Sequence, residues 1–245
     1  KHINALFYRD WIRNLRKKTE DGLFTVGEYW SGDVSKLHRY ITETEGEISL
    51  FDVPLHYNLY NASNDENYDL SKILEHTLLK ENSSMAVTFV DNHDTQPGQS
   101  LASFVGAWFK PLAYSIILLR QEGYPCVFYG DFYGIPHDNV EPVKELKTLI
   151  ELRKEKAYGK QNDYFDNPNF IGWTREGDEE HLKSGLAVVM SNKGAGEKRM
   201  YIGKQYSGEK FIDSLGNCQD EIIIDDEGFG NFKVKEKSVS VWVEA

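Results

Sequence analysis

The sequence predicts an α/β region followed by an antiparallel β domain, and two changes in residue pattern along the chain support this prediction. From residue 1 to about residue 156, helical periodicity alternates with short apolar runs of strand length. From residue 157 to residue 245 the helical patterns stop, and β-rich runs follow one another, separated by turns rich in Gly, Asn and Asp. These runs are FIGWTRE, GLAVVMS, KRMYIGK, EIIID, NFKV and SVSVWVEA. We therefore expect two domains, at residues 1–156 and 157–245.

The first region contains four apolar runs, each followed by a helical pattern. The runs are LFTVG, ISLFDV, AVTFV and YPCVFYG, and the helices are expected near residues 35–42, 71–81, 108–121 and 141–154. LFTVG and AVTFV are apolar throughout, which indicates strands buried on both faces. Strands that alternate with helices pair in parallel. Four such units make half of an eight-stranded (β/α)8 barrel.

The chain starts with a helical pattern that has no strand before it. Apolar residues recur there at every fourth position, as Ile3, Phe7, Trp11 and Leu15. They give the helix one broad apolar face, and Asp21-Gly22 is expected to end it.

A half barrel leaves two unpaired sheet edges, which is unfavourable for an isolated protein. Because the sequence also lacks an initial Met, we expect it to be part of a longer chain.

Composition excludes several classes of protein. The formal net charge is −11 with acids spread along the chain, which argues against nucleic acid and is compatible with a neutral substrate. No apolar run approaches twenty residues, so no membrane span is predicted. Cys126 and Cys218 form no CxxC motif or His-Cys cluster, so no zinc site is predicted. Their unlike surroundings favour two structural thiols over a disulfide.

Carboxylates follow two of the apolar runs. LFTVG leads into Glu28-Tyr29-Trp30, and AVTFV leads into Asp91-Asn92-His93-Asp94. Each acid alone reads most simply as a helix cap or a surface charge, but carboxyl ends of parallel barrel strands form the active face. Two carboxylates beside aromatic rings are typical of the active sites of glycoside hydrolases. The apolar neighbour Trp30 would keep Glu28 protonated and able to donate.

Both motifs resemble those of a known enzyme family. TVGEYW resembles the strand-five motif of the α-amylase family of glycoside hydrolases, and FVDNHDTQPGQSL resembles its strand-seven motif. The likeness extends over nearly the whole chain, including FDVPLHY, WFKPLAY, FYGDFYG, GWTREGD and SVSVWV, and is greatest to bacterial liquefying and cytoplasmic members. It implies the second half of a (β/α)8 TIM barrel followed by a carboxyl-terminal antiparallel β-sandwich.

The resemblance also implies roles for individual residues. Glu28 corresponds to the general acid/base, and Asp94 to the second aspartate, which holds sugar hydroxyls and favours the distorted transition state. Substrate-binding roles are implied for Lys1, His2, Tyr29, Trp30 and His93. The implied activity is retaining endo-hydrolysis of α-1,4-glucosidic bonds in starch or glycogen, with an α-glucan oligo- or polysaccharide as the partner.

One part of the family pattern is missing from the sequence. The nucleophilic aspartate of the family lies three residues before the position of Lys1, and a retaining mechanism needs it within about 5–5.5 Å of the acid. We therefore expect this chain to be inactive alone and to need the amino-terminal half of the same enzyme. Three alternatives stay open: a non-catalytic carbohydrate-binding fragment, a glucan transferase of the same family, and a structural half of a split protein.

Calcium is the structural cation that the resemblance implies for the full-length enzyme. The main-chain carbonyl of His2 corresponds to one ligand, and Asp163 to an acid of a second site in which Asn192 replaces another acid. We expect no calcium, or a partly formed site, in residues 1–245. Likeness to cytoplasmic members favours the cytoplasm, with secretion as the alternative because a signal peptide would precede Lys1.

Other polar residues are predicted to have structural roles. His56 is expected to be packed in the interior, and His76 to lie on the surface of the helix at 71–81. Asp131 either lines the cleft or forms an internal salt bridge. The acids at 178–180 and 225–227 are expected to be solvated charges in turns.

Overall fold

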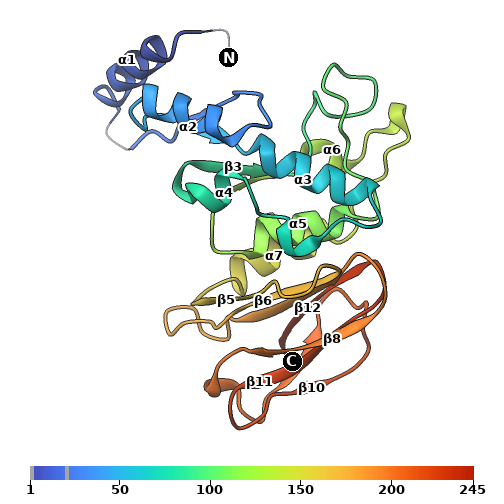
Figure 1. The fold of residues 1–245 in the computed structure, drawn as a ribbon. Coiled ribbons are helices and arrows are strands. Elements are labelled where there is room, and N and C mark those ends of the chain that lie inside the picture. The colour runs from blue at the N-terminus through green and yellow to red at the C-terminus, as the bar shows by residue number, and fades with distance from the viewer. Residues whose placement is uncertain (1–2, 20–21) are drawn as a thin grey trace. The chain divides into compact units, whose positions relative to one another are not determined.

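The computed structural model describes residues 3–19 and 22–245, which divide into two compact units (Figure 1). Of the described residues, the first unit comprises 3–19, 22–58, 74–89 and 122–127, and the second comprises 59–73, 90–121 and 128–245. Each unit is made of segments that are separated along the chain. The division therefore does not test the domain boundary expected at residue 156, which stays a prediction.

A parallel sheet forms the centre of the first unit. Its order is β1-β2-β3-β4, with β1 (Val26–Gly27), β2 (Ser49–Phe51), β3 (Ala86–Phe89) and β4 (Tyr124–Cys126). Val26 pairs with Ser49, Leu50 with Ala86, and Val87 with Tyr124. Spatial order follows chain order, as in a segment of a (β/α)8 barrel. The four predicted parallel strands are confirmed.

The strands differ in burial, and the prediction of a strand buried on both faces is confirmed for β3 but wrong for β1. Every residue of β3 is buried, whereas Val26 in β1 is 44% exposed and Tyr124 in β4 is 47% exposed. Phe24, just before β1, is also 55% exposed. β1 and β4 are the outer strands of the described sheet, so each has a neighbouring strand on one side only.

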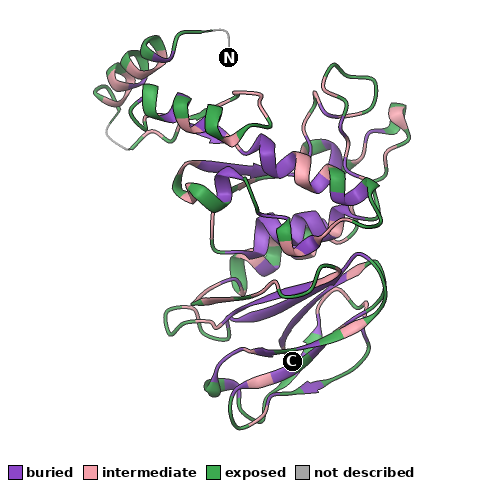
Figure 2. Cartoon of the chain, in the orientation of Figure 1, coloured by how far each residue is buried: buried purple, intermediate pink, exposed green. Residues whose placement is uncertain are grey.

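Two helices of the first unit lie where the sequence predicts them. α1 (Ala5–Arg16) starts at Asn4, whose Oδ1 accepts a hydrogen bond from the amide of Leu6 at 2.8 Å, and α2 (Val34–Glu43) starts at Asp33. α1 ends before the predicted stop at residues 21–22. Its apolar face is present but uncovered among the described residues: Phe7 is 57% and Trp11 is 50% exposed. Figure 2 accordingly shows α1 mostly in green and pink.

The helix predicted at 71–81 is wrong, and the true arrangement depends on one buried carboxylate. The structure has α3 (Val53–Asn64), a 3₁₀ turn η1 (Leu70–Lys72) and the short α4 (Leu78–Glu81). His76 takes a positive φ of 56°, which interrupts a helix. Asp52 accepts hydrogen bonds from the amides of Leu55, Leu78 and Leu79, so it caps the first turns of both α3 and α4.

The second unit contains three further α-helices. α5 (Lys110–Leu119) confirms the helix predicted at 108–121, and every residue of it except Pro111 is buried. α6 (Tyr129–Tyr133) follows β4, and α7 (Leu146–Glu155) starts five residues later than predicted. The remaining 3₁₀ turns in the part of the chain that the structure describes are η2 (Ser83–Met85), η3 (Pro136–Asp138) and η4 (Lys204–Tyr206). No helix within residues 3–19 and 22–245 has the length and apolar character needed to cross a membrane.

Eight antiparallel strands complete the second unit: β5 (Gln161–Tyr164), β6 (Phe170–Arg175), β7 (Leu186–Ser191), β8 (Gly196–Tyr201), β9 (Lys210–Asp213), β10 (Ile222–Ile223), β11 (Phe229–Val234) and β12 (Ser238–Glu244). They form a six-stranded sheet of order β10-β9-β12-β7-β6-β5 and a two-stranded sheet of β11 and β8. The antiparallel β part is confirmed. β5 and β9 were not predicted, because QNDY and KFID lack a continuous apolar run.

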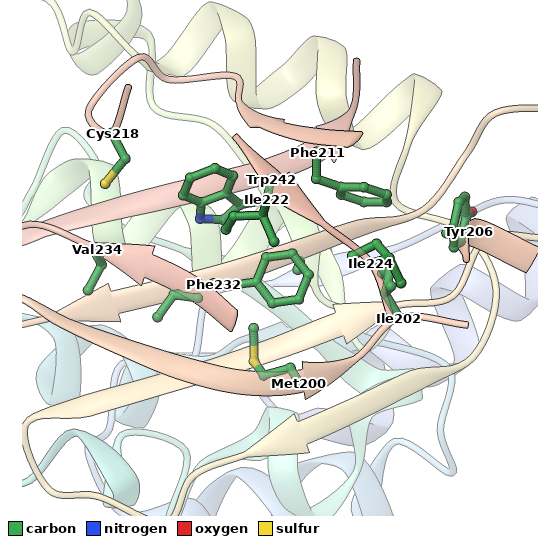
Figure 3. Packing of buried hydrophobic residues seen from close by; sticks show 12 residues of the cluster. Met200, Ile202, Tyr206, Phe211, Cys218, Ile222, Ile224, Phe232, Val234 and Trp242 are labelled. Atoms are coloured by element: carbon green, nitrogen blue, oxygen red, sulfur yellow. The ribbon is translucent and has the colours of Figure 1, made fainter. Parts of the chain in front are cut away.

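Side chains from both sheets meet in one apolar core (Figure 3). Phe211 and Trp242 come from the larger sheet, and Met200 and Phe232 from the smaller one. The ring centroids of Phe232 and Phe211 lie 6.2 Å apart in an edge-to-face arrangement, and those of Phe232 and Trp242 lie 6.3 Å apart. Phe232 is therefore one of the side chains through which the smaller sheet packs on the larger one.

We predict that Phe232→Ala lowers the free energy of unfolding by about 3–5 kcal/mol, because it removes a fully buried ring and leaves a cavity. Ile223→Ala, at an exposed position of β10, is the matched control and is expected to cost less than about 1 kcal/mol. Urea denaturation followed by circular dichroism measures both values. Equal losses in the two variants would contradict this account of the core.

Asp52 makes stability depend on pH. Burial raises its pKa from 3.8 to about 6, although hydrogen bonds from Leu79, Leu55 and Leu78 act in the opposite direction. The unfolded chain releases this proton near pH 3.8 and the folded chain near pH 6. The stability that the protonated Asp52 contributes to the folded chain is therefore fully present below pH 3.8 and is lost as pH rises through 6.

We predict that Asp52→Asn reduces the fall in unfolding free energy between pH 4 and pH 7 by roughly 2–3 kcal/mol. Chemical denaturation at several pH values gives the two slopes, and the slopes are compared rather than the absolute stabilities, because the amide also changes the capping of α3 and α4. Glu43→Gln, an exposed substitution in α2, should leave the slope unchanged. A slope for Asp52→Asn identical to that of the unmodified chain would show that Asp52 titrates normally.

Candidate active site

Glu28, Tyr29 and Trp30 directly follow β1 in the first unit. Glu28 is exposed and lines a cavity of about 400 Å³, whose walls include Trp11, Phe24 and Tyr40. The ring of Tyr29 packs on that of Tyr40, with centroids 5.0 Å apart. The carboxylate predicted to be the general acid is thus at the carboxyl end of a parallel strand, beside aromatic rings and open to a ligand.

Trp30 is held rigidly by an aromatic cluster. Its Nε1 donates a hydrogen bond to the hydroxyl of Tyr57 at 2.9 Å, and its ring centroid lies 6.0 Å from that of Phe89 at the end of β3. His56 is fully buried and stacks on Phe89 with centroids 5.1 Å apart and an interplanar angle of 9°. This confirms the prediction that His56 is packed structure, and it fixes the orientation of the Trp30 ring.

His93 and Asp94 belong to the second unit and lie in a turn whose backbone is tied by Asn92. The Oδ1 of Asn92 accepts hydrogen bonds from the amides of Asp94 at 2.9 Å and Thr95 at 3.0 Å. The Asp94 side chain is one-third exposed, and its Oδ1 lies 3.6 Å from the Nε2 of the largely exposed His93. The turn therefore presents a carboxylate and an imidazole side by side.

A buried ionic cluster, which we call the Lys110 cluster, anchors the segment that contains this turn. Lys110 at the start of α5 pairs with Asp91, at 3.1 Å from its Oδ2, and with Asp131 in α6. The hydroxyl of Tyr114 donates to Asp131 at 2.6 Å, and that of Thr95 donates to Asp91 at 2.9 Å. The ammonium and both carboxylates are at most 3% exposed. The cluster therefore joins the 91–95 turn to α5 and α6.

The electrostatics of the Lys110 cluster follow from its burial. Desolvation raises the pKa of Asp91 to about 7. The charge of Lys110 opposes this rise in pKa, and the charge of Asp131 adds to it. Burial also raises the pKa of Tyr114, with the charge of Asp131 acting in the same direction. One cation faces two carboxyl groups, so removing that cation leaves a buried, uncompensated negative charge.

Comparison with known proteins identifies the family. A family model described as the alpha amylase catalytic domain matches residues 4–197. The chain belongs to the α-amylase family. A second model, described as the α-amylase C-terminal domain, matches residues 186–243, within the antiparallel β part.

Curated α-amylases align with the whole chain. It is 52% identical over 245 residues to the α-amylase of Geobacillus stearothermophilus, covering 99% of this chain and 45% of that protein. It is 49% identical to the glucan 1,4-alpha-maltohexaosidase of Bacillus sp. (strain 707), covering 99% and 47%, and 42% identical to the cytoplasmic α-amylase of Escherichia coli, covering 99% and 51%. The chain spans about half the length of the curated relatives it matches.

Solved structures show the same fold at low identity. An Anoxybacillus α-amylase superposes with a TM-score of 0.73 at 17% identity, covering 100% of this chain and 57% of that one. The cyclomaltodextrin glucanotransferase CldA superposes with a TM-score of 0.71 at 18% identity, covering 100% and 55%. These matches confirm the predicted fold class of a (β/α)8 barrel portion with a carboxyl-terminal β domain.

In this α-amylase chain, Asp131 has the internal role that the sequence left open, because it is fully buried against Lys110 and Tyr114. Sequence reasoning missed Lys110 itself. The signal was present, since a lysine in the apolar run WFKPLAY must be paired if that run becomes a buried helix. Its two partners, 19 and 21 residues away in opposite directions, carry no local signature.

The predicted calcium ligand Asp163 does not have the surroundings of a cation site. Arg120 donates to both of its carboxylate oxygens, at 2.8 and 2.9 Å, so its charge is already matched by a guanidinium. Asn192 is buried, and its Nδ2 donates to the carbonyl of Tyr68 at 2.8 Å. Among residues 3–19 and 22–245, no group of three or more His, Cys, Asp or Glu side chains is placed to hold a metal ion. Lys1 and His2 lie outside the described residues.

The remaining predicted positions are structural or on the surface. His76 is exposed, although it lies in a turn between helices rather than on one. The acids at 178–180 and 225–227 lie in turns, where a hydrogen bond from the amide of Phe229 and the nearby Arg199 lower the pKa of Asp225. Cys126 and Cys218 are both free thiols, in agreement with the expectation of no disulfide.

We predict that Lys110→Met destabilises the chain by about 3–5 kcal/mol, because it leaves the carboxyl groups of Asp91 and Asp131 buried without a cation. Lys147→Met, on the exposed side of α7, is the matched control and should change stability by less than about 0.5 kcal/mol. Urea denaturation gives both values, and hydrogen exchange of the amides at 92–105 should accelerate only in the first variant. A loss below about 1 kcal/mol for Lys110→Met would contradict the assigned role of the cluster.

Proposed function

We propose that the full-length protein hydrolyses internal α-1,4-glucosidic bonds of starch or glycogen with retention of anomeric configuration. The observation that carries this proposal is the position of Glu28 at the carboxyl end of a parallel strand, in a chain 52% identical to a curated α-amylase. Active sites of (β/α)8 barrels are built from the carboxyl ends of their strands.

In this proposal Glu28 protonates the glycosidic oxygen and later activates water, and Asp94 orients sugar hydroxyls in the transition state. The exposure of Glu28 and the hydrogen-bonded backbone around Asp94 support these roles. Trp30 and Tyr29 supply aromatic walls, and His93 contributes an exposed imidazole. Lys1 and His2 are proposed to contact sugar on the strength of the family resemblance alone.

The nucleophile is proposed to come from a segment outside residues 1–245. In the family pattern it lies three residues before the position of Lys1, so the amino-terminal half of the enzyme is the partner that completes the site. An α-glucan substrate is supported by the name of the Bacillus maltohexaosidase and by distant structural relatives described in complex with maltotriose and maltose. A glucan transferase is the second candidate, supported by the structural match to a cyclomaltodextrin glucanotransferase.

The proposal also includes a cation and a cellular location. Calcium in the full-length protein follows from the resemblance, with the carbonyl of His2 as a ligand. The Arg120–Asp163 ion pair argues against a second calcium site at Asp163, because the carboxylate is already paired with a cation. We also propose a cytoplasmic location, supported by two free thiols and by 42% identity to a cytoplasmic α-amylase, with secretion as the alternative.

The decisive experiment joins this chain to the part of the Geobacillus stearothermophilus α-amylase that precedes the matched region. The chimera is expected to cleave maltoheptaose to products that carry the α-anomeric configuration, seen by NMR, whereas residues 1–245 alone should release none. Glu28→Gln in the chimera should lower kcat by at least ~100-fold, because it removes the proton donor.

Glu75→Gln, an equally conservative change at an exposed position of the same unit, is the matched control and should leave kcat unchanged. Three results would reject the hydrolase proposal: β-anomeric products, full activity of Glu28→Gln, or a folded chimera that leaves maltoheptaose intact. Transfer of glucan to added maltose in preference to water would favour the transferase.

A further inference from the structure

The segment that carries His93 and Asp94 is a long loop between β3 and α5. We call residues 92–105 the Asp94 loop; the described structure assigns no helix or strand within it. Residues 97–100 and 102 are exposed, whereas Thr95 near the start and Val105 at the end are fully buried. A loop without secondary structure keeps a side chain in one place only if it is anchored elsewhere, so the buried ends must hold Asp94.

One buried carboxylate contacts both ends of the Asp94 loop. The Oδ1 of Asp91 accepts a hydrogen bond from the hydroxyl of Thr95 at 2.9 Å. The amide of Val105 donates to the same carboxylate, with its nitrogen 3.3 Å from each oxygen. Asp91 is 2% exposed, so these hydrogen bonds are shielded from water, which makes each of them harder to break. The carboxylate of Asp91 therefore closes the loop at its base.

Thr95 connects the carboxylate of Asp91 to the backbone of Asp94. Its hydroxyl accepts from the amide of Asn92 at 3.0 Å, and the side chain of Asn92 in turn accepts from the amide of Asp94. Two further bonds cross the loop. The amide of Leu101 donates to the carbonyl of Asp94 at 3.2 Å, and that of Ser103 donates to the carbonyl of Thr95 at 2.9 Å. Removing the carboxylate of Asp91 therefore loosens the whole set of bonds that fixes Asp94.

The Lys110 cluster contains a second carboxylate with which Asp91 can be compared. Asp131 is buried as completely as Asp91, and both pair with the ammonium of Lys110. The side-chain hydrogen bonds of Asp131 in the described structure go to α5, through Lys110 and the hydroxyl of Tyr114. The two acids thus share a cation, but the hydrogen bonds to Thr95 and Val105 belong to Asp91. Loss of either acid leaves Lys110 paired with the other one.

We propose that Asp91 is a positioning residue of the proposed active site. By holding both ends of the Asp94 loop, it sets the place at which the carboxylate of Asp94 meets the sugar. Asp91 acts through Thr95 and Asn92 and, being buried, does not touch the substrate itself. A small displacement of a group that orients the substrate lowers the rate strongly, so this indirect role has a measurable effect. The inference rests on the proposed function for the role of Asp94.

The first test measures the Asp94 loop in residues 1–245 by hydrogen exchange. Asp91→Ala is expected to accelerate exchange of the amides of Thr95, Ser103 and Val105 about tenfold or more, because their hydrogen-bond network loses its buried acceptor. Asp131→Ala removes an equally buried partner of Lys110 and is the matched control; it should change exchange in the loop less than about twofold. Equal acceleration in the two folded variants, or none in Asp91→Ala, overturns the inference.

A milder pair of substitutions is used if Asp91→Ala does not fold, as judged by circular dichroism. Thr95→Val keeps the size of the side chain but removes the hydroxyl that bonds to Asp91, and it should accelerate exchange in the loop about three- to tenfold. Thr95→Ser keeps the hydroxyl and should restore slow exchange. Exchange that is equally fast in Thr95→Val and Thr95→Ser, or unchanged in both, overturns the inference.

The second test measures the kinetics of the chimera described above. Asp91→Ala, or Thr95→Val in its place, should raise KM for maltoheptaose about five- to tenfold, because a displaced Asp94 holds the sugar hydroxyls less well. A purely structural role lowers the amount of folded enzyme and leaves KM unchanged, which is the result expected for Asp131→Ala.

The two proposals fail in different ways. A chimera that hydrolyses maltoheptaose with the same KM in folded Asp91→Ala as in the unmodified chimera rejects the positioning role alone. A folded chimera without activity rejects the proposed function, whereas faster exchange of the Asp94 loop in Asp91→Ala but not in Asp131→Ala still supports Asp91 as the residue that holds this loop.

Discussion

The salt bridge between Lys110 and its two carboxylates, Asp91 and Asp131, is the interaction on which the second unit depends. Three ionisable groups in an apolar interior are unfavourable unless each is paired and hydrogen-bonded. Lys110 meets this condition only when α5, α6 and the turn at 91–95 are all in place, because each provides one member of the cluster. An arrangement that displaces any of the three leaves a charge unpaired, so the cluster specifies one arrangement of these elements.

The two predicted catalytic segments are held by different kinds of contact. Trp30 is fixed mainly by rings, since Tyr57 and Phe89 surround it and a single hydrogen bond sets its rotation. Asp94 is fixed through its backbone, because the side chain of Asn92 accepts from two successive amides while Thr95 bonds to Asp91. The side chains of Glu28, His93 and Asp94 keep at least partial exposure, which leaves them accessible to a ligand.

Local patterns in the sequence predicted the elements that depend on residues close together in the chain. Continuous apolar runs identified the four parallel strands, and alternation of β-rich runs with Gly-rich turns identified the β domain. The helix expected at 71–81 failed because Asp52, more than twenty residues away, captures the amides of Leu78 and Leu79. The ion pair between Asp163 and Arg120 was also outside the reach of any local pattern, because Arg120 lies 43 residues earlier.

Trp30 and Trp108 show why ring exposure and hydrogen bonding should be considered together. In both residues the indole N–H is bonded within the protein, to Tyr57 and to Ser63 respectively, so what remains for a ligand is the face of the ring. A ring face attracts apolar surface with little chemical discrimination. Selectivity must therefore come from polar groups near each ring. Glu28 lies two residues before Trp30 in the chain, and the Nζ of Lys237 lies 5.8 Å from the centroid of the Trp108 ring. A carboxylate can donate or accept a proton during a reaction, whereas an ammonium over a ring face contributes charge and hydrogen bonds, so in the proposed function the position of Trp30 is the one suited to chemistry.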